Sequence, residues 1–328
     1  MRVGTCVIGV GRMGSNHARC LTEMEEAELL AISDPDAERR RELAARFGCR
    51  EYAEHESMLA AERPDAVVLA VPTPLHLSVA LDVISRGCHV LVEKPLADRP
   101  ANAERIIEAA REAGVRLAVG HIERFNPAVR KLKEVIDEGA LGRVLSVSAK
   151  RVGLPSAHYL DTNVVVDLAV HDMDVMRFLL GTDLRVVSSV TGRLVGGPSE
   201  DYADILLLAG DVPCVVQVNW VTPVKIRTLS VIGSAGYAEM NYITQTVQLY
   251  RRQTSEPQLN YRELVATYGE AETETVHAGG EEPLKEELRA FFRAVRDGTE
   301  PEVSGPDGLA AVELADAALG VARQVPVL

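Results

Sequence analysis

An aspartate and a histidine stand four residues apart in the segment Asp167-Leu168-Ala169-Val170-His171. On a helix, residues at positions i and i+4 lie on the same face, one turn apart. A carboxylate so placed can orient or charge an imidazole, and histidine suits general-base catalysis near neutral pH. The spacing therefore predicts that His171 abstracts a proton with help from Asp167. The alternative is an exposed ion pair. A cluster with one histidine and no cysteine is a poor zinc site, so we expect no metal.

A lysine follows the apolar run Val90-Leu91-Val92, in the sequence Glu93-Lys94-Pro95. If the run is a strand of a parallel sheet, Glu93 and Lys94 lie at its carboxyl end, where ligands bind in open α/β sheets. There the Lys94 ammonium group can donate a hydrogen bond to a substrate hydroxyl. A solvated lysine at the end of a strand is the alternative.

Near the N-terminus, Gly9-Val10-Gly11-Arg12-Met13-Gly14 matches the pattern G-x-G-x-x-G. It follows the apolar run Val3–Ile8 and precedes a helical pattern, which is the context of a dinucleotide-binding loop. Here the glycines permit a tight turn and let the backbone, including Arg12 and Met13, approach a pyrophosphate at a helix N-terminus. A strand-turn-helix corner without a ligand is the alternative.

Two further segments extend this expected cofactor site. Asp34 stands where a carboxylate accepts hydrogen bonds from the adenosine ribose and repels a 2′-phosphate, so we predict NAD. A helix cap before Pro35 is the alternative role, and three arginines leave NADP open (Arg39, Arg40 and Arg41). The prolines of Val71-Pro72-Thr73-Pro74-Leu75-His76 fix a turn that we expect beneath the nicotinamide, with Thr73, Pro74 and His76 as contacts. For His76 the alternative is a helix surface.

The first 120 residues alternate short apolar runs with helical patterns, which is typical of βαβ units and a parallel sheet. We predict strands at Val3–Ile8, Glu28–Ile32, Ala66–Val71, His89–Val92 and Arg116–Val119, and helices at Ser15–Met24, Pro35–Phe47, Leu75–Ser85 and Asn102–Ala113. This part of the chain, residues 1–120, is predicted to be a doubly wound Rossmann domain.

The pattern changes after Gly120, and residues 121–328 are predicted to form an α+β domain on a mostly antiparallel open sheet. The expected strands are Val144–Lys150, Arg185–Leu194, Tyr202–Ala209, Cys214–Trp220, Ile226–Ile232, Tyr237–Tyr242 and Thr246–Tyr250. The expected helices are Pro127–Glu138, Val164–Leu180, Pro283–Arg296 and Pro306–Ala322, of which the last two can pack back on the first domain. Gln253–Glu274 is expected to be a long loop. Together the two parts give an α/β fold class.

Composition limits the classes of partner. Hydrophobic residues make up 47% and charged residues 25% of the 328 residues, which is ordinary for a globular protein. The net charge of −13 argues against binding to nucleic acid or to an anionic membrane. The five cysteines contain no C-x-x-C pair, and the chain starts with no apolar leader. We therefore expect a cytoplasmic protein.

Taken together, these motifs resemble the glucose-fructose oxidoreductase / inositol dehydrogenase family along essentially the whole chain. The resemblance rests on the glycine loop, Thr73-Pro74, Glu93-Lys94-Pro95, Asp167-x-x-x-His171-x-x-Asp174 and the helix from Pro283-Leu284 to Phe291. It implies that Lys94, Asp167 and His171 are catalytic and that the second domain builds homodimers or homotetramers. The chain departs from the family at Thr162-Asn163, where members often carry two glycines, so Asn163 is expected at the substrate.

The segment Gly120-His121-Ile122-Glu123-Arg124-Phe125-Asn126-Pro127 looks like the nucleotide-sugar branch, particularly UDP-N-acetylglucosamine 3-dehydrogenases, whose 3-keto product passes to an aminotransferase. Through this resemblance we expect Arg124, Phe125 and Asn126 at the substrate. Lys150 and Arg151 are expected to supply further cations for a diphosphate, and the alternative is that these are surface charges.

The hypothesis is therefore NAD-dependent oxidation of a sugar hydroxyl, with His171 as base, Lys94 holding the hydroxyl and Asp167 assisting the base. Two alternatives remain open. The first is a free-sugar or inositol dehydrogenase, which needs no cation for a pyrophosphate. The second is a protein that binds NAD without turnover.

Overall fold

The computed structural model describes residues 2–155, 162–195, 197–251 and 273–325. The chain divides into two compact units. The first contains Met1–Ile122 and Glu281–Asp316, and the second contains Glu123–Gly280 and Ala317–Leu328.

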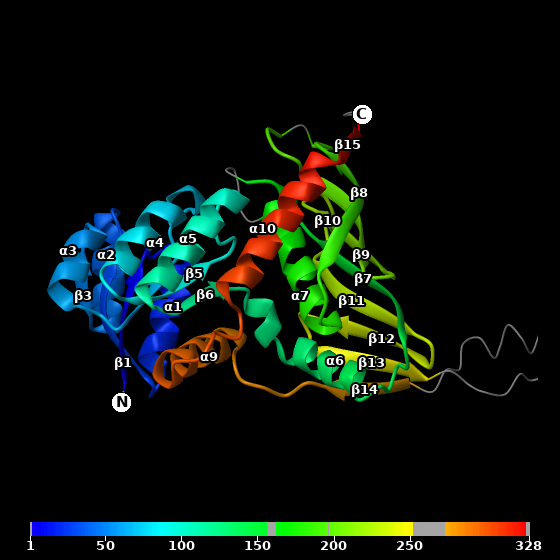
Figure 1. Ribbon diagram of the computed structural model, residues 1–328, viewed down its shortest axis with the longest axis horizontal. Helices are drawn as coiled ribbons and strands as arrows, with labels where there is room; N and C mark the ends of the chain where they lie inside the picture. Colours follow the sequence, from blue (N-terminus) through cyan, green and yellow to red (C-terminus); the bar gives the residue numbers. More distant parts are fainter. Residues whose placement is uncertain (1, 156–161, 196, 252–272, 326–328) are drawn as a thin grey trace, which may run out of the picture. The chain divides into compact units, whose positions relative to one another are not determined.

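The first unit is built on a six-stranded parallel sheet with the strand order β3-β2-β1-β4-β5-β6 (Figure 1). This is the strand order of a Rossmann fold, in which the order reverses between β1 and β4. The strands are β1 (Val3–Ile8), β2 (Ala27–Ser33), β3 (Arg50–Tyr52), β4 (Ala66–Leu69), β5 (His89–Glu93) and β6 (Leu117–Gly120). The helices between them are α1 (Arg12–Glu23), α2 (Ala37–Phe47), α3 (His55–Glu62), η1 (Thr73–Leu75), α4 (His76–Ser85) and α5 (Pro100–Ala113).

A helix from near the end of the chain completes this unit. Helix α9 (Pro283–Asp297) packs against α1, and its apolar stripe joins the core that surrounds β1. The buried residues of the stripe are Leu284, Leu288, Phe291 and Phe292. Helix α10 (Gly305–Gly320) follows.

The second unit is a nine-stranded mixed sheet with the order β14-β13-β12-β11-β7-β10-β9-β8-β15. Only the pairs β7–β10 and β8–β15 are parallel. Its strands are β7 (Val144–Val152), β8 (Leu184–Gly192), β9 (Tyr202–Ala209), β10 (Val212–Asn219), β11 (Ile226–Gly233), β12 (Gly236–Asn241), β13 (Thr246–Arg251), β14 (Thr273–His277) and β15 (Ala322–Val325).

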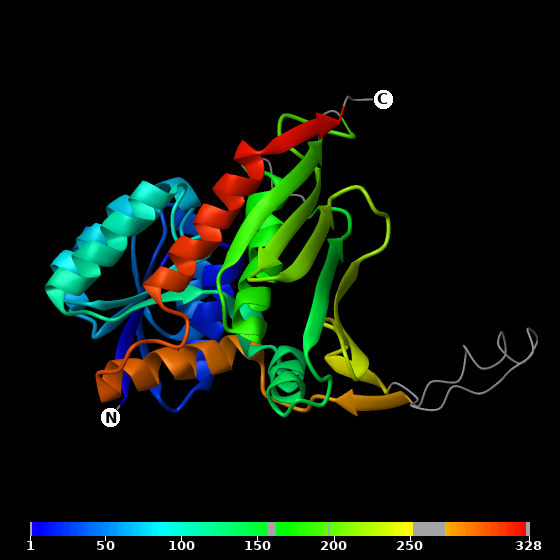
Figure 2. The ribbon, with the colours of Figure 1, turned by 45° about the vertical axis from the view of Figure 1, so that its right-hand side comes forward.

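One face of this sheet is covered by helices. Helix α7 (Val170–Leu180) contacts β7 and β10, and α6 (Pro127–Asp137) contacts β12 and β13 (Figures 1 and 2). Strand residues alternate accordingly, so that Val147, Ala149 and Arg151 are buried while Ser148 and Lys150 are exposed. The alternation separates a helix-covered face from an open face.

The predicted fold class is confirmed, with a parallel Rossmann sheet followed by a mostly antiparallel sheet. The prediction missed the short elements β3, α3, β14 and β15 and the 3-10 helices η1 and η2 (Ile122–Phe125). The end of the helix predicted at Pro306–Ala322 is wrong, because α10 ends at Gly320 and Ala322 begins β15. Most of the expected loop Gln253–Glu274 lies outside the described residues, and its last residues belong to β14. Among the described helices, none is long and apolar enough to cross a membrane.

Candidate active site

The glycine loop joins β1 to α1 and has the shape that a dinucleotide requires. Gly9 has a φ of 82°, and a Cβ there would lie 2.7 Å from Ala70 O. A Cβ on Gly14 would lie 1.8 Å from Gly9 O, so the start of α1 packs directly on the loop. At Gly11, by contrast, a Cβ would meet nothing within 4 Å, and no side chain caps α1. The first N–H groups of α1 are thus placed to bind a phosphate, and the loop fits NAD.

Asp34 follows β2 and is buried beside this loop. Its Oδ2 accepts a hydrogen bond from Val10 N at 2.9 Å, and its Oδ1 accepts one from Asp36 N at 2.9 Å. Each carboxylate oxygen can accept a second hydrogen bond, so the ribose role stays a proposal alongside this bracing role. Arg39 Nη1 lies 3.5 Å from Asp34 Oδ1.

His76 begins α4, and its side chain is buried rather than exposed to a cofactor. Nδ1 lies 2.9 Å from Pro95 O, and Nε2 lies 2.9 Å from Val71 O. Burial lowers the pKa of His76, and hydrogen bonding to these carbonyl groups opposes that effect. The expected cofactor contact stays a prediction, and the observed role of His76 is to tie the Thr73-Pro74 turn to the segment that contains Lys94.

Glu93 is the other residue that fixes this segment. Its Oε2 accepts a hydrogen bond from Lys94 N at 3.1 Å, and its Oε1 lies 2.8 Å from His17 Nε2. Both side chains are buried. Gly120, opposite Glu93 in β6, leaves the necessary room, since a Cβ there would lie 3.0 Å from Glu93 Oε2. The predicted Glu93 contact with the cofactor remains a proposal, and the observed role is to hold the Lys94 backbone.

Asp167 and His171 lie on the helical segment before and within α7, but the segment is not a regular α-helix. Asp167 belongs to a π-helical turn, η3 (Val165–Ala169), and His171 to the first turn of α7. A π turn holds one more residue than an α turn, so the expected one-turn spacing is only approximate. Asp167 is buried and His171 is half-buried. π turns often mark functional sites.

Asn163 precedes this turn and caps it. Its Oδ1 accepts hydrogen bonds from Val165 N at 3.1 Å and Val166 N at 3.0 Å. The Asn163 side-chain oxygen, which was expected at the substrate, is therefore bound to the start of the π turn that carries Asp167.

Two of the arginines expected at the substrate are buried ion pairs of the second unit. Arg124 donates to Asp174 through Nε at 2.8 Å and Nη2 at 2.6 Å. Arg151 donates to Asp172 through Nε at 2.7 Å and to Glu123 through Nη1 at 2.8 Å. Both guanidinium groups are nearly inaccessible to solvent. Their observed partners are carboxylates, and a contact of either arginine with a diphosphate stays a prediction.

The remaining expected substrate residues have other surroundings in this structure, and their contact with the substrate stays a prediction. Phe125 is buried beneath Arg130. Asn126 caps α6 through Ala128 N and donates to Tyr242 O at 3.1 Å. Lys150 lies on the open face of the sheet, opposite to the face that α7 covers. Because successive side chains of a strand point to opposite faces of the sheet, Lys150 and the adjacent Arg151 lie on different faces.

One cation on the helix-covered face was missed, namely Arg227 of β11. It is half-buried and lies directly opposite Arg151 in the adjacent strand. Side chains alternate along a strand, so Arg227 lies on the same face as Leu229 and Val231, which are buried. This period-two pattern in the sequence could have placed Arg227 on the covered face.

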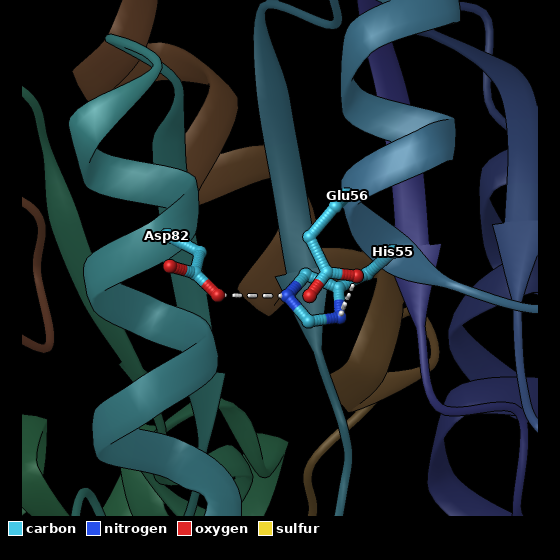
Figure 3. A group of neighbouring side chains, drawn as sticks. All are labelled: His55, Glu56 and Asp82. Atoms are coloured by element: carbon cyan, nitrogen blue, oxygen red, sulfur yellow. Dashed lines mark hydrogen bonds and ion pairs between the residues drawn. The ribbon is translucent and has the colours of Figure 1, made fainter.

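A cluster of His55, Glu56 and Asp82 has side chains of the types that bind metals (Figure 3). His55 Nε2 lies 3.0 Å from Asp82 Oδ2, and Nδ1 lies 3.3 Å from Glu56 Oε2. Both carboxylates are about half exposed. The two ring nitrogens thus face different carboxylates, as in an ion-pair cluster that joins α3 to α4.

A Rossmann domain with a lysine at the carboxyl end of β5, together with a sheet domain that presents an aspartate and a histidine on one helical segment, defines an NAD-dependent oxidoreductase. The oxidoreductase family with an NAD-binding Rossmann fold matches residues 3–121, and the C-terminal domain of the same family matches residues 129–239. The chain belongs to the Gfo/Idh/MocA family of dehydrogenases that act on sugar and inositol hydroxyl groups.

Its relatives include enzymes with different substrates. The chain is 30% identical to myo-inositol 2-dehydrogenase of Thermotoga maritima, over 97% of this chain and 95% of that one. It is 29% identical to UDP-N-acetylglucosamine 3-dehydrogenase of Acidithiobacillus ferrooxidans, over 77% of each chain. A solved structure of the latter enzyme superposes with a TM-score of 0.86 at 25% identity, over 98% of both chains.

Proposed function

We propose that the protein oxidises a nucleotide sugar with NAD and that the substrate is UDP-N-acetylglucosamine, which becomes its 3-keto derivative. The observation that carries the proposal is the likeness to a UDP-N-acetylglucosamine 3-dehydrogenase over 98% of both chains, with a TM-score of 0.86. The 29% identity to that enzyme supports it. The product is a ketone suited to a following aminotransferase.

In the reaction, NAD when bound supplies the acceptor for the hydride. His171 takes the proton of the sugar hydroxyl, and Lys94 donates a hydrogen bond to the same oxygen as negative charge develops on it. Asp167 stabilises the charged imidazole. Glu93 and His76 fix the backbone on either side of Lys94, which keeps its ammonium group in place.

A second candidate is an inositol or free-sugar dehydrogenase. It is favoured by the 30% identity to myo-inositol 2-dehydrogenase over 97% of this chain. The two candidates differ in charge, because a nucleotide sugar brings a diphosphate and an inositol brings none.

The deciding experiment measures NADH formation with UDP-N-acetylglucosamine, N-acetylglucosamine and myo-inositol, with NAD and NADP in parallel. Because alcohol oxidation by NAD is often unfavourable at equilibrium, an aminotransferase specific for the 3-keto sugar is added as a trap. We expect turnover of the UDP-sugar alone, with a product two mass units lighter, and a preference for NAD through Asp34. Brisk oxidation of inositol with no trapped keto-sugar would favour the second candidate.

The proposal extends to assembly and location. We propose a homodimer or homotetramer formed through the open face of the second sheet, and a reducing, cytoplasmic location. All five cysteines are free thiols, and four of them are buried.

A further inference from the structure

Arg227 occupies a distinctive position on the helix-covered face of the second sheet. It lies directly opposite Arg151 in the antiparallel pair of β11 and β7, so both side chains point to the same face. Arg151 reaches Asp172 of α7, the helix that also carries His171. The Arg227 side chain therefore lies on the same side of the sheet as the proposed base.

Two carboxylates whose charges act on Arg227, those of Asp172 and Glu123, are bound to Arg151. Asp172 binds Arg151 through both oxygens, at 2.7 and 3.1 Å, and Glu123 binds Arg151 at 2.8 Å. Within the described part of the chain, the Arg227 guanidinium group makes no hydrogen bond and no ion pair.

This arrangement leaves a positive charge in an unfavourable environment. Burial, and next the charge of Arg151, lower the pKa of Arg227, while Glu123, Asp172 and Asp167 act in the opposite direction. A half-buried guanidinium group beside a second one is stabilised when an anion supplies the missing partner. The protein has a net charge of −13, so two adjacent arginines on one sheet face form a positive region in an otherwise acidic molecule.

We propose that Arg227 binds an anionic group of the substrate, namely the diphosphate of a nucleotide sugar. The site lies on the sheet face that is covered by the helical segment with Asp167 and His171. The identity of the anion rests on the proposed function, whereas the anion site itself rests on the geometry of β11 and β7. The planar guanidinium fork fits phosphate oxygens better than an ammonium group does. Arg227 thus takes the role for which Arg124, Lys150 and Arg151 were expected.

The test compares Arg227→Gln and Arg227→Lys with a matched control, Lys150→Gln, which removes a cation from the open face of the same sheet. Calorimetry measures the binding of UDP and of inorganic pyrophosphate to the intact protein without turnover. We expect Arg227→Gln to raise the Kd for UDP by on the order of 10- to 100-fold, the loss of a charge-assisted hydrogen bond. Arg227→Lys should recover part of the affinity, and Lys150→Gln should change it little.

Kinetics and cofactor binding separate this inference from the proposed function. With the UDP-sugar, Arg227→Gln should raise KM far more than it lowers kcat, while the Kd for NAD stays the same. If the UDP-sugar is oxidised and Arg227→Gln binds UDP as tightly as the unmodified protein, the inference is overturned and the function stands. If no UDP-sugar is oxidised but pyrophosphate binding still depends on Arg227, the anion site stands and the substrate is another anion. A thermal melt of each variant checks folding. If the Gln variant unfolds, the affinity of Arg227→Lys for UDP decides the test, because this variant keeps the positive charge but loses the guanidinium fork.

Discussion

Two buried carboxyl groups in the first unit, those of Glu93 and Glu287, have pKa values shifted in opposite directions. Burial acts to raise the pKa of Glu93, but the hydrogen bond with His17 and the charges of His17 and Lys94 outweigh it and lower that pKa. Burial, and next the charge of Glu93, raise the pKa of Glu287 well above its ordinary value. Glu287 occupies an apolar position of α9 between Leu284 and Leu288, and among the residues that the structure describes neither of its carboxyl oxygens has a hydrogen-bond partner. Glu93 is thus the ionised member and Glu287 the neutral one.

The first prediction concerns stability and pH. Because the pKa of Glu287 is raised in the folded protein, its contribution to stability is fully present below the unfolded pKa and is lost as pH rises toward the folded value. The variant Glu287→Gln binds no proton. Relative to the unmodified protein, its free energy of unfolding should therefore increase as pH rises above the unfolded pKa of glutamate, by at most about 1.4 kcal/mol per pH unit.

Denaturant unfolding at several pH values measures this difference. The control is Glu286→Gln, because Glu286 lies on the same helix and pairs with Arg289 at the surface. That variant should lose a few tenths of a kcal/mol with no growth above pH 5. An advantage for Glu287→Gln that does not depend on pH would mean that Glu287 is ionised when folded.

The second prediction concerns the catalytic residues. Lys94→Met and His171→Ala should each lower kcat by on the order of 10² or more, since each removes a group that acts on the reacting hydroxyl. NAD binding, measured by fluorescence, should persist because the glycine loop is unchanged. Lys150→Met serves as the control for loss of a lysine and should leave kcat near normal. Near-normal turnover in both test variants would remove these residues from the mechanism.

At the scale of residues, the sequence indicated which charged side chains could take part in chemistry, but it did not predict which of them form ion pairs with one another. Asp174 lies 50 residues from Arg124, and Asp172 lies 21 residues from Arg151, so neither pairing has a local signal. His76 was assigned to the cofactor from its position alone, whereas its partners are two carbonyl oxygens of separate loops. Glu287 could have been noticed as the acidic residue in an otherwise apolar stripe.

At the scale of elements, the βαβ part was predictable because short apolar strands that alternate with glycine-capped helices give a strong local pattern. The short strand β3 has three residues, Arg50–Tyr52, with two charged members, and therefore gave no strand pattern. The π turn at Val165–Ala169 is also invisible to periodicity, because its apolar residues fit an α-helix equally well.

The third prediction separates two glycines of the same loop. Gly14→Ala should destabilise the protein by at least about 2 kcal/mol, since the new Cβ would lie 1.8 Å from Gly9 O and the backbone must move. Gly11→Ala meets no neighbour within 4 Å and should leave Tm nearly unchanged. It should nevertheless raise the Kd for NAD by about tenfold or more, because the methyl group occupies the side from which the pyrophosphate approaches.

Thermal melts without cofactor, followed by NAD titration, distinguish these effects. If Gly11→Ala binds NAD normally, the pyrophosphate does not approach this part of the loop. If Gly14→Ala melts like the unmodified protein, α1 can shift at no cost and the close packing is not required.

At the scale of the whole molecule, the open face of the second sheet carries exposed apolar residues on the three neighbouring strands β8, β9 and β10, and on β11 beyond β7. Val190 of β8, Leu206 of β9 and Val215 of β10 are each 38% exposed, and Ile232 of β11 is 48% exposed. Leu206 lies directly opposite Val215 in the antiparallel pair. The apolar residues of β8, β9 and β10 are neighbours on this face, and exposed apolar patches often mark interfaces between protein chains.

The last prediction is that this face joins two copies of the chain. A stable interface buries about 800 Å² on each partner, with its apolar centre excluded from water. Two lysines at that centre would have to be desolvated without partners, and in a twofold interface each substitution is present twice. The double variant Leu206→Lys/Val215→Lys should therefore be a monomer by light scattering, while the unmodified protein is a dimer or tetramer.

The control Ile243→Lys changes another exposed apolar residue, 52% exposed, in the turn between β12 and β13. This variant should keep the native mass. If the double variant also keeps the native mass, the copies associate through another surface. If it becomes a monomer that still binds NAD, the Rossmann unit functions without the interface, as its separate core around β1 leads us to expect.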